Sequence, residues 1–176
     1  MPEGFMKQPD KTPAPTQPPR ILNPSKALRT LRKTPTLLAA LLRGASAAQL
    51  ASATDGPGGW TVVDVIAHMR DLENAYQDRV RLMLAQTHPT FVVVSNEELT
   101  AQNATLSRNV GDVVAEYTRR RQAFIALLEG LTDAQWQRTG VHPQQGEATV
   151  LDVAINTGLH DVDHLEQLAR ILASST

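Results

Sequence analysis

Hydrophobic residues along this sequence recur every three or four positions in four long segments. This spacing is typical of amphipathic helices that bury one face, and it predicts helices over residues 26–43, 61–86, 110–129 and 149–172. Glycine commonly ends a helix, and Gly44 and Gly130 follow the first and third segments. Four helices of this length predict an all-α protein that folds as a four-helix bundle.

Capping signals mark where two of these helices and one shorter helix begin. In a capping box, a Ser or Thr at the helix N-cap pairs with an acidic residue three positions later. The sequence has three such pairs, which are Thr61 with Asp64, Ser95 with Glu98, and Thr149 with Asp152. The middle pair predicts a short helix inside the connection between the second and third long helices.

The lengths of the connections predict the directions of the helices. The link between the first two helices and the link between the last two are short, which favours antiparallel neighbours. Residues 86–109 form a longer connection, which allows the second and third helices to run parallel. Only the Phe-Val-Val-Val segment at 91–94 is typical of a strand, and residues 131–148 are expected to form a loop. These features predict an up-down-down-up bundle in which the second and fourth helices are antiparallel.

The N-terminal segment differs from the rest of the chain. Seven of the eleven prolines lie within the first 24 residues, and proline fixes φ and lacks the N–H that helices and sheets require. We therefore expect a Pro-rich, disordered tail over residues 1–24 and a four-helix-bundle domain over residues 25–176.

Composition narrows the range of functions. The 176 residues include no cysteine, so the chain supplies no disulfide, zinc ribbon or cysteine nucleophile of its own. The formal net charge of -1 gives no general attraction to nucleic acid or to an anionic membrane. The first two dozen residues lack the apolar core of a signal peptide, and no apolar run reaches the ~18–20 residues that span a bilayer. We expect a cytoplasmic protein that binds neither nucleic acid nor membrane.

Three of the five histidines fall inside predicted helices, and their spacing indicates a metal site. His160 and His164 lie four residues apart on the fourth helix, so both imidazoles leave the same face. His68 lies roughly 10 Å from the start of the second helix, and the pair lies roughly 12–18 Å from the end of the fourth, at 1.5 Å per residue. Antiparallel packing would bring all three to one level, where neutral imidazoles could bind Zn²⁺, Ni²⁺, Fe²⁺ or Cu²⁺ with open positions. The alternative is that these histidines are ordinary polar residues.

Two segments of the chain resemble the DinB/YfiT-like family of four-helix metalloproteins. They are the segment from Trp60 to Glu73, WTVVDVIAHMRDLE, and the segment that begins HPQQGEATVLDV at His142 and contains HDVDH. The resemblance covers about residues 25–172. It implies that His68, His160 and His164 bind a divalent metal, with Zn²⁺ or Ni²⁺ ahead of Fe²⁺. The HP-x-x-G turn that starts at His142 resembles the YfiT-like branch of the family.

The resemblance implies a metal-dependent enzyme but leaves its reaction open. Family members include transferases that use low-molecular-weight thiols such as bacillithiol or mycothiol, thiol-dependent maleylpyruvate isomerases, and proteins described only as metal-dependent hydrolases. A metal held by three imidazoles would lower the pKa of a thiol cosubstrate or of water. A small-molecule substrate is expected in either case. The alternative is a non-catalytic binding or dimerisation scaffold, and an apolar helix face is also compatible with a homodimer.

Three further residues are candidates for the pocket around the metal. Gln167 lies one turn after His164 and could hydrogen-bond a ligand, or be a polar residue at the border of the stripe. Arg121 could bind a carboxylate from the apolar side of the third helix, although we expect its side chain to reach solvent. His142 is expected to border the pocket, and Asp161 and Asp163 are expected to be solvated or to lie behind the ligands.

Overall fold

The computed structural model describes residues 22–104 and 106–174 and contains four long helices. These are α1 (Pro24–Arg43), α3 (Val62–Ala85), α5 (Val110–Glu129) and α7 (Val150–Ala173). Shorter elements lie in the connections, namely α2 (Ala47–Ser52), α4 (Asn96–Gln102), α6 (Asp133–Trp136), β1 (Thr139–His142) and β2 (Gly146–Thr149). The predicted all-α class and the four-helix bundle are therefore confirmed.

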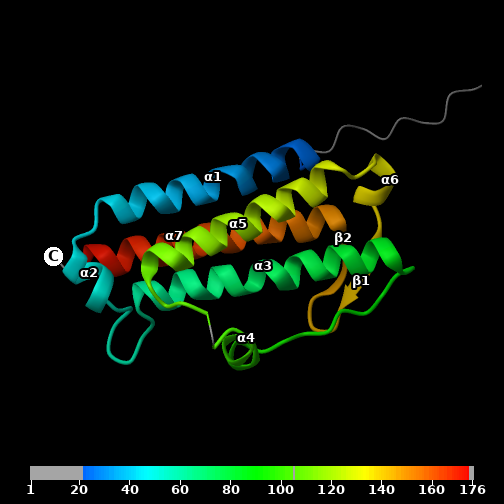
Figure 1. The fold of residues 1–176 in the computed structure, drawn as a ribbon. Coiled ribbons are helices and arrows are strands. Elements are labelled where there is room, and N and C mark those ends of the chain that lie inside the picture. The colour runs from blue at the N-terminus through cyan, green and yellow to red at the C-terminus, as the bar shows by residue number, and fades with distance from the viewer. Residues whose placement is uncertain (1–21, 105, 175–176) are drawn as a thin grey trace, which may run out of the picture.

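The four long helices form an up-down-down-up bundle. α3 and α5 run in one direction and α1 and α7 run in the other, and the long α4-containing connection joins the two parallel helices α3 and α5 (Figure 1). α3 packs against both α5 and α7, and α1 packs against α7 and α5. The antiparallel pair of α3 and α7 is the one that the sequence predicts to carry the histidines.

The three predicted capping boxes are present. The backbone N–H of Thr61 donates to the Asp64 carboxylate at 2.9 Å, and the N–H of Asp64 donates back to the Thr61 hydroxyl. The same reciprocal bonds begin α4 at Ser95 and α7 at Thr149. Each box satisfies N–H groups that have no partner inside the first turn, so the sequence fixes where these helices start.

The predicted tail lies mostly outside the described residues. Pro24, which the sequence analysis placed in the tail, is instead the first residue of α1. Its missing N–H costs no hydrogen bond there, because the first turn of a helix has no partner for it. Pro35 lies inside α1, which continues as one helix to Arg43.

The connections contain more structure than the sequence predicts. Residues 131–148, expected to be a loop, form α6 and the antiparallel hairpin of β1 and β2. The expected strand at 91–94 is wrong, since this segment has no regular structure and Val92 is 81% exposed. Phe91 alone is anchored there, because its N–H donates to the carbonyl of Val141 and its ring packs so closely on Gly140 that a Cβ would clash. The hairpin is held by these long-range contacts, which local spacing does not reveal.

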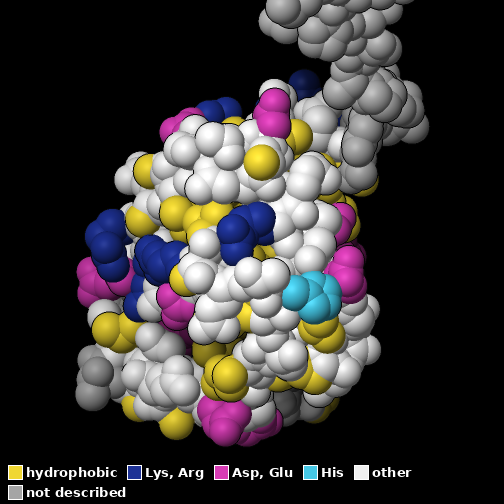
Figure 2. Space-filling view, turned by 90° about the vertical axis from the view of Figure 1, so that its right-hand side faces the viewer, with side chains coloured by type: hydrophobic (Ala, Val, Ile, Leu, Met, Phe, Trp, Pro, Cys, Tyr) yellow, Lys and Arg dark blue, Asp and Glu magenta, His cyan; other side chains and the backbone are white. Residues whose placement is uncertain are grey.

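The core consists of two apolar clusters along the bundle, one around Leu31, Phe124 and Leu128 and one around Leu38, Val65 and Tyr117. In α7, the hydrophobic Val162 is 47% exposed, whereas its neighbour Asp161 is buried. Among the described residues, no helix is long and apolar enough to span a membrane. At the end of the bundle seen in Figure 2, basic and acidic side chains are interspersed with hydrophobic patches.

Candidate metal centre

Three histidines from α3 and α7 meet at one level of the bundle. The Nε2 atom of His160 lies 3.1 Å from Nε2 of His68 and 3.0 Å from Nε2 of His164. One ring nitrogen from each residue lies within 4.8 Å of the other two. The antiparallel packing of α3 and α7 therefore brings the three side chains together, and we call them the imidazole cluster.

The orientation of His164 follows from a chain of hydrogen bonds. Gln167 donates its amide NH₂ to the carboxylate of Asp55 at 2.9 Å, and a carboxylate can only accept. The amide oxygen of Gln167 therefore faces His164, where it lies 2.8 Å from Nδ1. Nδ1 must carry the proton of the neutral ring, and Nε2 is left as a lone pair that points into the imidazole cluster.

Burial keeps two of the rings uncharged. Burial and the neighbouring His164 together lower the pKa of His68 to about 4. Burial also lowers the pKa of His160 to about 3, together with the charges of His164, His68 and Arg121. Both rings are neutral at physiological pH, as metal ligands must be.

The donor set fits a divalent transition metal. Ring nitrogens that bind one ion at about 2.1 Å lie about 3.0–3.4 Å apart, and the two Nε2 contacts of His160 match this separation. A proton on one ring nitrogen can hydrogen-bond to the lone pair of only one other ring. One metal cation can bind the lone pairs of all three rings. Three imidazoles also leave coordination positions for water or a substrate.

Aromatic side chains form the walls of the imidazole cluster. The Trp60 ring centroid lies 5.0 Å from that of His68 and stacks 6.2 Å from that of His164. The Tyr76 ring lies 6.0 Å from that of His160, on the side of the hairpin. Burial raises the pKa of Tyr76 to about 12, so its phenol stays protonated and can donate a hydrogen bond.

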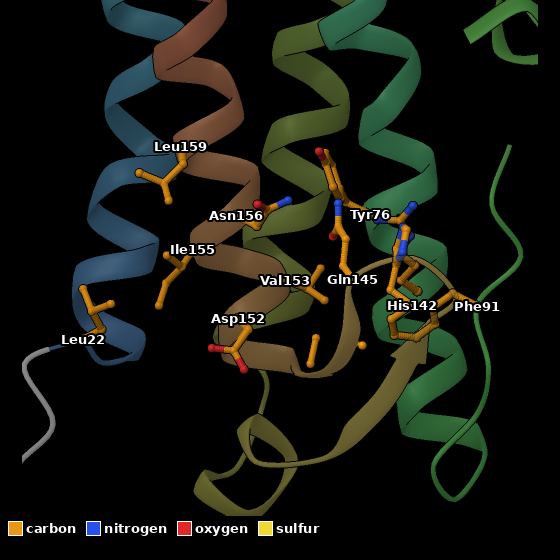
Figure 3. A pocket seen from close by; sticks show the side chains of 13 residues that line it. Leu22, Tyr76, Phe91, His142, Gln145, Asp152, Val153, Ile155, Asn156 and Leu159 are labelled. Atoms are coloured by element: carbon orange, nitrogen blue, oxygen red, sulfur yellow. The ribbon is translucent and has the colours of Figure 1, made fainter. Parts of the chain in front are cut away.

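Two hollows reach these walls. A groove of about 670 Å³ between α3 and α4 is lined by Trp60, His68 and Asp71. A cavity of about 300 Å³ lies between α3, α7 and the hairpin, with Tyr76, His142 and Asn156 among its lining side chains (Figure 3). The structure thus places His142 at the border of a pocket, next to the Tyr76 wall.

The structure places Arg121 away from both hollows. Its side chain is fully buried, where the sequence analysis expected it to reach solvent. It donates to Glu73 from Nε at 3.1 and 3.0 Å and from Nη2, and its Nη1 donates to Asp161 at 2.5 Å. Asp161 is itself 1% exposed, so of the two expectations for this residue, solvated or behind the ligands, the first is wrong. We call Arg121, Glu73 and Asp161 the buried ion cluster.

The charged groups of the buried ion cluster hydrogen-bond to one another. Burial acts to lower the pKa of Arg121, but the charges and hydrogen bonds of Glu73 and Asp161 raise it above the usual range. Thr34 accepts from Arg121 at 2.7 Å and donates to Asp161 at 2.6 Å. With these partners in place, the Arg121 guanidinium is not free to bind a substrate carboxylate.

Sequence reasoning missed four residues of this region. They are Asp55, Trp60, Tyr76 and Arg79, of which Asp55 and Trp60 lie in the Gly-rich connection before α3. Trp60 carries a signal that could have found it, because it comes directly before the N-cap of the helix that bears His68. Asp55 carries none, since its partner Gln167 is 112 residues away.

Comparison with known proteins identifies relatives along most of the chain. A family model described as the DinB superfamily matches residues 30–168. "Putative metal-dependent hydrolase YfiT" of Bacillus subtilis is 26% identical over 117 residues, which span 64% of this chain and 66% of that relative. A "Putative metal-dependent hydrolase" of Bacillus cereus is 31% identical over 120 residues, which span 65% of this chain and 68% of the relative.

Solved structures share the fold. The structure of YfiT from Bacillus subtilis has a TM-score of 0.77 at 20% identity, covering 92% of this chain and 93% of its own. TT2238, a four-helix bundle protein, has a TM-score of 0.61 at 25% identity, over 84% of this chain and 99% of its own. A mycothiol-dependent maleylpyruvate isomerase has a TM-score of 0.67 at 14% identity, over 84% of this chain and 61% of its own.

Proposed function

Because this chain belongs to the DinB superfamily, we propose that it is a divalent-metal-dependent enzyme that acts on a small-molecule substrate. His68, His160 and His164 are the proposed ligands. The convergence of their Nε2 atoms carries this proposal, since lone pairs at this separation repel one another unless a cation or a proton lies between them. The names of the two Bacillus relatives support a metal-dependent reaction.

The proposed ion is Zn²⁺ or Ni²⁺, with Fe²⁺ as a third candidate, because imidazole suits all three. When bound, the ion supplies Lewis acidity that lowers the pKa of water or of a thiol enough for the deprotonated nucleophile to form near neutral pH. Side chains of the protein hold and orient the ion. Gln167 fixes the ring of His164, and Trp60 and Tyr76 screen the ligands from bulk water.

The nucleophile is either water or a low-molecular-weight thiol. The Bacillus relatives carry names that indicate hydrolysis. A thiol would have to come from a cosubstrate, because the chain has no cysteine. Asp71, Glu73 and Asp161, three buried carboxylates on the helices that carry the ligands, are paired with arginines. Because these three are not free to act as a general base, the arrangement favours the thiol, which a bound metal deprotonates outright.

The metal content of untagged protein tests the ligand set. Protein purified without a chelator is expected to contain about one Zn or Ni per chain by elemental analysis. His68→Ala and His160→Ala should each lose the ion while remaining folded. His88→Asn is the matched control, because His88 lies at the surface with φ of 51°, which Asn tolerates, and contacts Thr139 instead of the imidazole cluster.

Activity assays on the metal-loaded protein then separate the two nucleophiles. Ester or amide turnover without added thiol would support hydrolysis, and turnover of an electrophile that requires added thiol would support transfer. Wild-type protein that neither contains nor takes up a metal would contradict the proposal. It would instead favour a non-catalytic scaffold with histidines as buried polar residues.

A further inference from the structure

The cavity beside the imidazole cluster contains an arginine that has no acidic partner. Arg79 of α3 lines the cavity of about 300 Å³ together with Tyr76 and Phe91, which are labelled in Figure 3. Its guanidinium carbon lies 5.5 Å from the centroid of the Tyr76 ring and 5.8 Å from that of Phe91. Its Nε atom is buried and has no hydrogen-bond partner among the described residues.

Unlike Arg79, the other arginines of α3 have acidic partners. Arg70 pairs with Asp71 at 2.7 Å, and Arg81 pairs with Asp78 at 3.0 Å. Within the described part of the chain, Arg79 has no carboxylate at ion-pair distance. A buried donor without a partner costs free energy, because it has lost its hydrogen bonds to water without replacing them. Such a cost is commonly retained at a binding site, where a ligand supplies the missing acceptor.

Two neutral donors share the cavity with Arg79. The Nδ1 atom of His142 accepts from the N–H of Gln144, so in the neutral ring the proton is on Nε2. The charge of Arg79 and burial both act to lower the pKa of His142, which keeps this ring uncharged. Asn156 adds a carboxamide from α7. Asp152, the acidic residue in the lining, has Oδ2 engaged in the capping box with Thr149.

Apart from Gln145, the remaining side chains that line the cavity are apolar. Val153, Ile155 and Leu159 of α7 are among these side chains. In Figure 3, Val153 lies on the side of α7 that holds Tyr76 and Phe91, whereas Ile155 and Leu159 lie on the side of Leu22. A single guanidinium balances one negative charge, and its planar fork matches a carboxylate in a bidentate pair. The cavity therefore suits a small molecule with one carboxylate and a hydrophobic body.

We propose that Arg79 binds the carboxylate of the substrate and thereby sets the substrate class, small monocarboxylates with an apolar body. The location supports a link to the reaction, because Tyr76 touches both the guanidinium of Arg79 and the ring of His160. Asn156 lies one helical turn before His160 on the same face of α7. A substrate held at Arg79 would extend past Tyr76 toward the imidazole cluster. That the bound carboxylate is a substrate rests on the proposed function. Binding of the carboxylate to Arg79 does not itself require the metal.

A matched pair of ligands tests this site. The probes are 3-phenylpropionate and 3-phenylpropionamide, which differ in charge but have nearly the same shape, titrated calorimetrically into the metal-loaded protein. We expect the carboxylate to bind about 10–100-fold tighter than the amide, the range typical of a charged hydrogen bond. Arg79→Gln should remove this preference. Arg81→Gln is the matched control on the same helix, and it should keep the preference because Arg81 is not part of the cavity lining.

Further variants separate the alternatives. Thermal unfolding checks that Arg79→Gln is folded, and Arg79→Lys, which keeps the charge, should retain part of the preference. Equal binding of the two probes by wild-type protein, or an unchanged preference in folded Arg79→Gln, would overturn the proposal. So would a preference that His160→Ala abolishes and Arg79→Gln keeps, because the carboxylate would then bind the metal. An Arg79-dependent preference in wild-type protein that neither contains nor takes up a metal would support the anion site while contradicting the proposed function.

Discussion

The imidazole cluster and the buried ion cluster share helices α3 and α7, and α5 adds Arg121 to the second, but the two clusters have opposite chemistry. α3 supplies His68 to one and Glu73 to the other, and α7 supplies His160 and Asp161, which are adjacent in sequence. Neighbours on a helix point about 100° apart, so adjacent residues of α7 belong to different clusters. The bundle thus places a neutral site and a fully ionic site side by side.

The two clusters differ in how their polar atoms are satisfied. In the buried ion cluster, the guanidinium of Arg121 is paired with two carboxylates, and its members are at most 1% exposed. In the imidazole cluster, half-buried rings direct nitrogen atoms at one another without a proton for each contact. The comparison indicates that the first cluster stabilises the fold and that the second is completed by a ligand from outside the chain.

The largest expected effect comes from breaking the buried ion cluster. Arg121→Met should lower the free energy of unfolding by about 3–5 kcal/mol, because it leaves the Glu73 and Asp161 carboxylates buried without a partner. Chemical denaturation of the metal-free protein measures this change. The triple variant Arg121→Met, Glu73→Gln, Asp161→Asn removes the charges together and should recover much of the loss. An Arg121→Met protein as stable as wild type would show that the cluster is not structural.

The contribution of the imidazole cluster to the stability of the metal-free protein should depend on pH. As the pH falls below about 6.5, the unfolded chain takes up protons on His68 and His160, whereas the folded pKa values are about 4 and 3. The unfolded state then binds more protons, so each of these rings should lower the stability of the metal-free protein by on the order of 3 kcal/mol between pH 7 and pH 4. Denaturation at a series of pH values measures the slope.

The two clusters should differ in how the free energy of unfolding changes with pH. Arg121 keeps its proton throughout the range, so it contributes no such dependence. His160→Gln should make the slope roughly half as steep, and His88→Asn, at the surface, should leave it nearly unchanged. A slope that is the same in wild type and His160→Gln would contradict the low pKa of this ring.

The imidazole cluster was predictable from the sequence, and the buried ion cluster was not. Capping boxes, which are local sequence patterns, mark where α3 and α7 start. A rise of 1.5 Å per residue then gives the height of each histidine along the bundle, once the two helices are known to be antiparallel. The partners of Arg121 are 48 and 40 residues away in sequence. Their pairing depends on the rotation of three helices about their axes, which the hydrophobic pattern does not fix for Asp161.

The same reasoning explains why Arg79 went unnoticed. On α3 it is an ordinary polar residue of an amphipathic helix, and only the hairpin closes a cavity around it. The hairpin itself was missed, because its contacts to Phe91 join segments that are about 50 residues apart. The cavity around Arg79 therefore depends on packing between distant segments, whereas the three histidines could be identified from local sequence spacing.

A smaller effect is expected from the residue that orients His164. Gln167→Leu removes the acceptor of the Nδ1 proton, and outer partners of this kind change metal affinity by about 10–100-fold. Competition with a chromophoric chelator measures the Kd of the metal. Gln122→Leu, on the exposed face of α5, is the matched control. Unchanged affinity in Gln167→Leu would show that the ring of His164 is held by its packing on Trp60 alone.

The smallest expected effect, and the most specific, comes from Asp55→Asn. Asp55 can only accept, so it holds the NH₂ of Gln167 away from His164. An Asn can donate as well, which allows the Gln167 amide to turn and present its NH₂ to Nδ1 of His164. The ring would then shift its proton to Nε2 and lose the lone pair that faces the other imidazoles.

Metal affinity in Asp55→Asn should fall by less than about tenfold, because both orientations of the amide remain accessible. The weak ion pair of Asp55 with Arg170, 3.7 Å apart at the surface, contributes little to this change. Histidine ¹⁵N chemical shifts of the metal-free protein report the tautomer directly, and the fraction of His164 protonated at Nε2 should rise. If that fraction and the affinity both stay at their wild-type values, the amide of Gln167 is oriented by something other than Asp55, and the lone pair of His164 does not depend on a residue 109 positions away.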